Sequence, residues 1–178
     1  MDEAPTTGTV TPPQQDGSHR DSFEAFYVWE FPRLVALARG LATPLAAEDL
    51  AQEAMLVAYR RWTHVSELER PEFWVRRVCA NLAASQFRRR LVEIRATSRI
   101  ARKTQSEVLD DPSEEFWSAV RRLPRRQAQA AALRFIYDMT ISDIAATLDC
   151  SQGTVKQHLS RARASLATAL ATTEEADS

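Results

Sequence analysis

No glycine occurs between Gly40 and Gly153, and the other two glycines in the chain, Gly8 and Gly17, lie near its beginning. Sandwiches, barrels and phosphate-binding loops need glycine where φ is positive or where the backbone approaches a ligand. A chain with so few glycines is expected to be helical. The sequence therefore predicts an all-α fold and argues against a β-rich protein or a phosphate-loop enzyme.

Composition divides the 178 residues into two helical blocks. Residues 1–20 contain three prolines and little to bury, which predicts a disordered tail. Helical patterning fills residues 21–93, a polar linker is expected at 94–112, a second helical block spans 113–171, and 172–178 form an acidic tail. Blocks of roughly 70 and 60 residues are near the lower limit for an independent core, so we expect two compact helical bundles.

The formal net charge of −1 hides separate acidic and basic segments. Nine acidic and three basic residues lie between Met1 and Ala58, whereas ten basic and two acidic residues lie between Arg70 and Lys103. Basic blocks attract polyanions. Charge therefore suggests a nucleic acid partner, although an ordinary solvated surface fits the charge alone equally well.

Other features exclude several classes of protein. The longest apolar run, Ala54 to Tyr59, is far shorter than the roughly 20 residues that cross a bilayer. The first residues lack the basic and apolar regions of a secretory signal. Cys79 and Cys150 form no disulfide framework, and the histidines and cysteines have no metal-ligand spacing. We expect a cytoplasmic protein without membrane insertion, cofactor, metal or enzymatic activity.

Three helices are expected in the first block. The first begins after Ser22, a good N-cap, and Pro32 is expected to kink or split it. The second is expected at about 46–62, with alanine and leucine on the inward face. The third begins at Pro71, which suits the first helical position, and runs to about Leu91.

A polar stripe lies opposite the apolar face of the helix at 46–62. It consists of Asp49, Gln52, Glu53, Leu56 and Arg60. By pattern alone it fits a solvated helix face, but a leucine within it favours a docking surface.

A basic stripe on the third helix comprises Arg77, Asn81, Ala84 and Arg88. Arginine binds phosphates and asparagine can bond a base edge, so this face suits nucleic acid. Aromatic residues at 62, 73 and 74, among them Trp74, flank the preceding loop. They could stack on single-stranded bases or belong to the core.

The segment Met139–Leu166 predicts a helix-turn-helix. Thr140 and Asp143 form a variant of the capping box, and Asp149 and Cys150 form a tight turn. Ser151 caps the second helix, whose apolar residues recur at helical spacing. The free, polar face of that helix carries Thr154, Lys156, Gln157, His158, Arg161 and Arg163. An ordinary corner between two helices is the alternative.

These motifs together resemble a bacterial RNA polymerase sigma factor of the small, two-domain extracytoplasmic-function group. The matching stretches are 47–62, 74–90, 121–135 and the terminal helix-turn-helix, in the order and spacing of that family. The family often has glycine in the turn of the helix-turn-helix, where this chain has Asp149, a residue that tolerates the left-handed region.

The resemblance assigns a role to each surface. It implies that the stripe from Asp49 to Arg60 docks on a coiled coil of the polymerase's largest subunit. It implies that Trp74, Arg77, Asn81 and Arg88 act on the −10 promoter element and its melting, and that the loop at 63–73 captures a flipped base. The helix starting at Ser151 would read the −35 element, and the second domain would also contact the polymerase's flap region.

The resemblance further implies a monomer when free, with promoter DNA and core polymerase as partners and an anti-sigma factor as a candidate regulator. Two other functions fit parts of the sequence. One is a stand-alone helix-turn-helix regulator, which would dimerise and bind duplex DNA by itself. The other is an adaptor that binds only protein.

Overall fold

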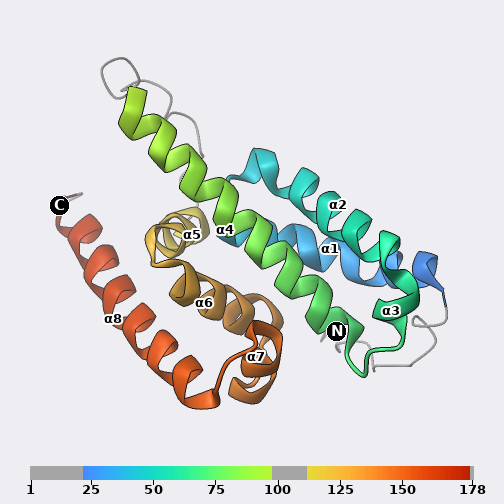
Figure 1. Ribbon diagram of the computed structural model, residues 1–178. Helices are drawn as coiled ribbons and strands as arrows, with labels where there is room; N and C mark the ends of the chain where they lie inside the picture. The colour runs from blue at the N-terminus through green and yellow to red at the C-terminus, as the bar shows by residue number, and fades with distance from the viewer. Residues whose placement is uncertain (1–21, 98–111, 177–178) are drawn as a thin grey trace, which may run out of the picture.

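The computed structural model describes residues 22–97 and 112–176, and within these ranges every regular element is an α-helix. The helices form two bundles, α1–α4 and α5–α8, as expected (Figure 1). The expected N-terminal tail and nearly all of the expected linker lie outside the described residues.

The first bundle begins with α1 (Phe23–Leu41). Ser22 Oγ accepts a hydrogen bond from the backbone N–H of Ala25 at 3.1 Å, which confirms the predicted N-cap. Pro32 does not split the helix, contrary to one of the two expectations for it. The guanidinium of Arg33 donates to the carbonyl of Trp29 at 2.7 Å, in the turn next to the proline.

Helices α2 (Pro44–Arg60) and α4 (Pro71–Thr97) pack against α1. Alanines dominate the buried face of α2, which lets the helices approach closely. A short helix, α3 (Trp62–Ser66), occupies the start of the expected loop at 63–73. Helix α4 extends past Leu91 to Thr97, into the segment expected to be a linker.

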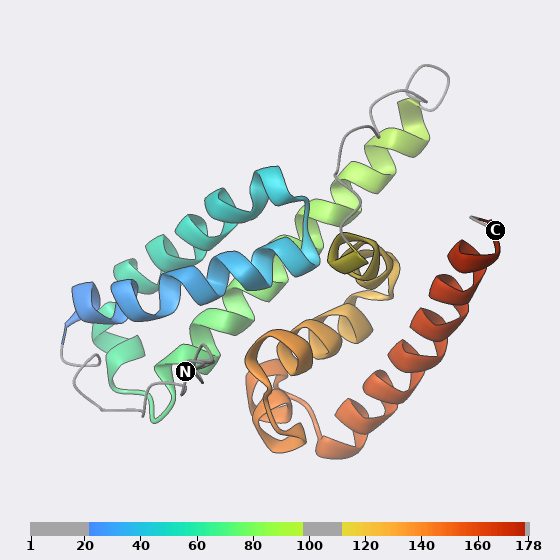
Figure 2. The same cartoon turned by 180° about the vertical axis from the view of Figure 1, so that it is seen from behind.

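The second bundle consists of α5 (Pro112–Arg122), α6 (Arg125–Tyr137), α7 (Ile141–Leu148) and α8 (Gln152–Ala176). Helices α7 and α8 form the predicted helix-turn-helix. Helix α8 runs along the outside of the bundle, as Figure 2 shows from behind.

The two bundles pack directly on each other. Helix α1 contacts α5 and α6, and α4 contacts α6 and α7. Buried apolar residues of both bundles belong to one continuous core. Since the sequence predicted only a connection through a linker, this contact is the main new feature of the fold.

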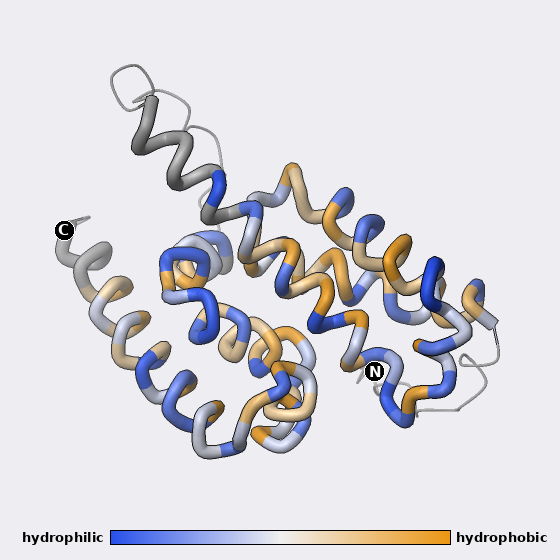
Figure 3. Tube along the Cα trace, viewed as in Figure 1, coloured by the Kyte–Doolittle hydropathy of each residue, from blue (hydrophilic) through white to orange (hydrophobic). Residues whose placement is uncertain are grey.

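Hydrophilic and hydrophobic residues are interspersed along the coloured parts of the helices (Figure 3). The buried apolar residues recur at helical spacing, so the helices present apolar faces to the core. Among the described residues, no helix combines the length and the apolar character needed to span a membrane.

Candidate nucleic-acid interface

The stripe on α2 lies open on the surface. Asp49, Gln52, Glu53, Leu56 and Arg60 are all exposed. The buried residues Ala47, Leu50, Ala51, Ala54 and Ala58 hold the opposite face of α2 in the core. Leu56 keeps 46% of its surface exposed although it is apolar. This surface therefore offers two carboxylates beside an uncovered leucine, a composition suited to a basic protein partner.

The stripe on α4 is partly covered. Trp74, Arg77 and Asn81 are half-buried. Asn81 Oδ1 accepts hydrogen bonds from Gln129 Nε2 at 3.0 Å and from the guanidinium of Arg125, both on α6. The side chain of Arg88 lies outside the described residues.

The aromatic side chains near the 63–73 loop take part in packing. The ring of Trp62 lies 5.3 Å from that of Phe23 and 5.1 Å from that of Phe26, measured between centroids. Phe73 is buried, and the guanidinium of Arg70 lies 3.9 Å above its ring. Phe73 therefore belongs to the core and Trp62, which is half-buried, packs against it, which was the alternative to base stacking.

The helix-turn-helix forms as its sequence predicts. Thr140 Oγ1 accepts from the backbone N–H of Asp143, and Asp143 accepts from the backbone N–H of Thr140, which completes a capping box. Asp149 ends α7 with φ of 55°, in the left-handed region where glycine is common. Ser151 Oγ accepts from the backbone N–H of Thr154 at 3.1 Å and so caps α8.

Four apolar residues orient α8 by packing inward. They are Val155, Leu159, Ala162 and Leu166, and all four are buried. As a result, Lys156, Gln157, Arg161 and Arg163 are exposed, as is Ser151, while Thr154 and His158 are half-buried. Gln157 and Arg161 are one helical turn apart on the free face, which is where a helix in a major groove presents its side chains.

His158 lies at the edge of this face. Its pKa is lowered from the ordinary value of 6.5, first because burial disfavours the charged imidazolium, and then because Arg126 and Arg161 are positively charged. At pH 7 the imidazole is therefore mainly neutral, and most of the positive charge of the free face comes from the lysine and the arginines.

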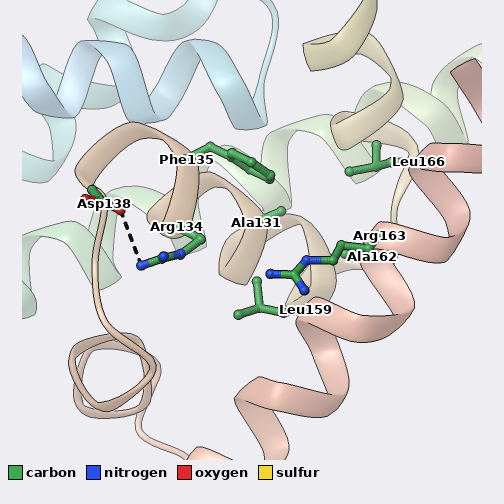
Figure 4. Close-up of a pocket in the computed structure, with 8 residues that line it drawn as sticks. All are labelled: Ala131, Arg134, Phe135, Asp138, Leu159, Ala162, Arg163 and Leu166. Carbon is green, nitrogen blue, oxygen red and sulfur yellow. Dashed lines mark ion pairs between the residues drawn. The ribbon is translucent and has the colours of Figure 1, made fainter.

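A hollow of about 380 Å³ lies between α6 and α8. Its apolar lining includes Phe135, which is 54% exposed, and its charged lining includes Arg134, Asp138 and Arg163 (Figure 4). Arg134 Nη1 lies 3.3 Å from Asp138 Oδ1. Sequence reasoning missed this hollow, because its two walls come from helices that only the fold brings together. Arg163, which the sequence assigned to the free face of α8, is one of the residues that line this hollow.

A buried ion pair was also missed. Arg76 Nε and Nη2 donate to Glu30 Oε1 and Oε2 at 2.7 and 2.9 Å, and Tyr137 OH donates to Glu30 Oε1 at 3.2 Å. Burial raises the pKa of Glu30, against the lowering effect of its bonds with Arg76. Burial also acts to lower the pKa of Arg76, but the bonds and charge of Glu30 outweigh it and the pKa is raised. Arg76 is therefore charged.

In the part of the chain that the structure describes, no three His, Cys, Asp or Glu side chains gather into a group that could hold a metal ion.

Comparisons with known proteins match the segments that carry these surfaces to two regions of one protein family. The family described as Sigma-70 region 2 matches residues 30–91, which contain the α2 and α4 stripes, and Sigma-70, region 4 matches residues 113–166, which contain the helix-turn-helix. The RNA polymerase sigma-E factor of Streptomyces antibioticus is 31% identical over 125 residues, 69% of each chain. That of Streptomyces coelicolor is 28% identical over 147 residues, covering 81% of this chain and 83% of the relative.

A solved structure is similar over both bundles. It contains the sigma factor RpoE of Bartonella quintana in complex with the anti-sigma factor NepR, and it superposes with a TM-score of 0.65 at 26% identity, covering 83% of this chain and 96% of that chain. Together these matches show that the chain belongs to the extracytoplasmic-function group of the sigma-70 family of RNA polymerase sigma factors.

Proposed function

We propose that three surfaces of this chain carry out three separate functions of a sigma factor. As a member of the family, the chain is an alternative sigma factor that directs core RNA polymerase to promoters. In our proposal, residues 21–93 bind the polymerase and the −10 element, and residues 113–171 read the −35 element. The chain would act in the cytoplasm as a regulator, leaving the chemistry to the polymerase.

The observation that carries this proposal is the exposed face of α8. Gln157 and Arg161 are uncovered on a helix that a capped turn and four buried residues orient. A bidentate amide suits adenine, and a guanidinium suits guanine or phosphate. Ser151, Thr154, Lys156, His158 and Arg163 would add contacts around these two residues.

On the first domain, the exposed stripe from Asp49 to Arg60 would dock on a basic coiled coil of the largest subunit. Trp74, Arg77, Asn81 and Arg88 would hold the opened −10 strand. The hollow between α6 and α8, with an exposed Phe135 at its edge, is our candidate for the contact with the flap region. Because RpoE of Bartonella quintana binds an anti-sigma factor, such a regulator is a candidate partner here too.

Abortive transcription tests this proposal. Purified core polymerase is incubated with a promoter library, with and without this chain. We expect short RNA products only when the chain is present, since core polymerase lacks promoter recognition of its own. A stand-alone regulator or an adaptor would bind DNA or protein without enabling initiation, and that outcome would contradict the proposal.

A further inference from the structure

His158 lies on α8 next to residues of the free face. Thr154 is four positions before it and Arg161 three positions after it, so the three side chains are neighbours on the helix. His158 is half-buried, and its Nδ1 atom is buried without a hydrogen-bond partner among the described residues. A second proton would place an unpaired N–H at Nδ1, so the free chain favours a neutral ring. Nε2 is the nitrogen that can bond a partner outside the chain.

Two guanidiniums flank this imidazole. Arg126 approaches it from α6 and Arg161 from α8, and the positive charge of each acts on the ring. Arg126 Nη1 donates to the carbonyl of Leu148 at 3.3 Å and to Gln129 Oε1 at 3.5 Å, which hold its guanidinium in place. Helices α5 and α7 also pack against α8, but they add no charge that shifts the pKa of His158. We call Arg126, His158 and Arg161 the His158 cluster.

The two arginines of the His158 cluster are not neutralised from within the described part of the chain. Both are exposed, and no acidic side chain that the structure describes lies within ion-pair distance of either. In contrast, Arg76, Arg121 and Arg134 each pair with a carboxylate. Like charges repel each other, so two such guanidiniums beside one imidazole favour an anion from outside the chain.

The backbone of duplex DNA supplies such an anion. A helix in the major groove lies between two lines of phosphates, and a phosphate oxygen accepts hydrogen bonds from guanidinium and imidazole N–H groups. Gln157, the neighbour of His158, is proposed above to bond a base edge in that groove. DNA carries one negative charge per roughly 1.7 Å of its axis, so its field opposes that of the two arginines.

We propose that the His158 cluster binds a phosphate of the −35 element and that His158 takes up a proton from the solvent when it does so. This inference rests on the −35 role proposed above for α8. The phosphate provides the negative charge that an imidazolium lacks in the free chain. His158 is therefore a proton-linked DNA contact, whereas the two arginines are permanently charged.

Proton uptake makes DNA affinity depend on pH in a defined direction. In the free chain, burial and then the charges of Arg126 and Arg161 hold the pKa of His158 below 6.5. An opposite charge within about 4–6 Å moves a pKa by roughly 1–3, so the pKa is higher in the DNA complex. Affinity is then highest below the free pKa, falls as the pH rises through the interval between the two values, and is constant above it. A difference of about one corresponds to a roughly tenfold loss of affinity across that interval.

The His158 cluster itself is tested on the free, full-length chain. NMR titration of the imidazole gives the pKa of His158. Removing a nearby positive charge raises a histidine pKa, so Arg126→Gln and Arg161→Gln should both raise it. Arg163→Gln is the matched control, because Arg163 is an exposed arginine of the same helix whose charge does not act on His158. The same pKa in wild type and all three variants would overturn the inference.

The contact with DNA is tested with holoenzyme assembled from core polymerase and the full-length chain. Fluorescence anisotropy gives the affinity for a promoter from the library described above, at several pH values on both sides of 6.5. We expect the affinity of wild type to rise as the pH falls and that of His158→Gln to rise much less. His158→Arg, which is always charged, should keep a high affinity at every pH. All other titrating groups are shared, so the difference between wild type and His158→Gln isolates His158.

NMR on the free chain measures proton uptake directly. A saturating duplex pool of random sequence is added, because phosphates are present in every sequence. We expect the pKa of His158 to rise. A pKa that stays the same or falls would overturn the inference, as would parallel pH profiles for wild type and His158→Gln holoenzymes.

Abortive transcription separates these results from a failure of the proposed function. If transcription occurs but the pH profiles are parallel, the chain is a sigma factor without a proton-linked DNA contact. If the pKa of His158 rises with DNA but no protein supports transcription, the proposed function fails and the proton-linked contact remains.

Discussion

Arg76 binds both carboxylate oxygens of Glu30 inside the first domain, and Tyr137 of the second domain completes the group. The guanidinium carbon of Arg76 lies 4.0 Å from the centre of the Tyr137 ring. Glu30 is fully buried, so its charge depends on these partners for compensation. One cluster therefore serves both the core of the first domain and its contact with the second.

Removing one member of the Glu30–Arg76 ion pair should lower the free energy of unfolding. Glu30→Ala leaves a buried guanidinium without its partner, and we expect the free energy of unfolding to fall by about 3–5 kcal/mol. Replacing the pair by Glu30→Met with Arg76→Leu should cost much less, and Tyr137→Phe about 0.5–1.5 kcal/mol. Urea denaturation measures all three. Equal losses for the single and double variants would show that packing, not charge, explains the effect.

Charge reversal on α2 should weaken binding to core polymerase. Asp49 and Glu53 are exposed, so Asp49→Arg with Glu53→Arg should leave the circular dichroism spectrum unchanged while repulsion replaces attraction at the interface. Fluorescence anisotropy with labelled chain gives the affinity for core. Glu24→Arg with Glu48→Arg, the same change in charge at other exposed sites, should have a much smaller effect. Unaltered binding of the Asp49 and Glu53 variant would refute the docking assignment.

Asn81→Ala should impair initiation most on closed duplex DNA. Opening must overcome base stacking of roughly 1.4 kcal/mol per step, so contacts made only with separated strands drive it. A template with a pre-melted bubble should restore most of the activity, measured by abortive transcription. If the bubble gives no rescue, the bond from Gln129 indicates that Asn81 acts structurally instead.

Gln157→Ala should change the sequence preference for DNA, whereas Lys156→Ala should lower the affinity for all sequences. Losing a bidentate base contact costs about 1–3 kcal/mol and relaxes preference at one position. Losing a phosphate contact weakens all sequences alike and lowers the salt slope by about one unit. Selection from randomised −35 elements with each holoenzyme measures both effects. A changed preference for Lys156→Ala alone would mean that α8 lies in the groove in another orientation.

The pKa of His158 predicts a pH dependence of stability. The folded chain holds this pKa below 6.5, so the unfolded chain binds more protons in the interval between the two values. The free energy of unfolding therefore rises with pH across that interval, and the contribution is complete above about 6.5. Urea denaturation at several pH values should show a weaker rise for His158→Gln. A measured His158 pKa at or above 6.5 in the folded protein, by NMR, would contradict this.

Local chemistry explains why the helices and the helix-turn-helix could be predicted. Ser22, Thr140 and Ser151 form their caps with residues three positions away, and the four inward residues of α8 follow the helical period. Asp149 adopts its left-handed conformation within a single turn. Since each of these interactions spans a few residues, the sequence contains them directly.

The partners of Asn81 and Glu30 depend on the tertiary structure instead. Gln129 lies 48 positions from Asn81, and Arg76 lies 46 positions from Glu30. From the sequence alone, each of these polar residues could equally well lie on a solvated surface as in a contact between helices. The sequence by itself determined an all-α chain with a polar stripe on α2, a basic stripe on α4 and a helix-turn-helix. Only the packing of α6 and α7 on α4 decided which of those residues are covered, because contacts between distant segments depend on how whole helices fit together.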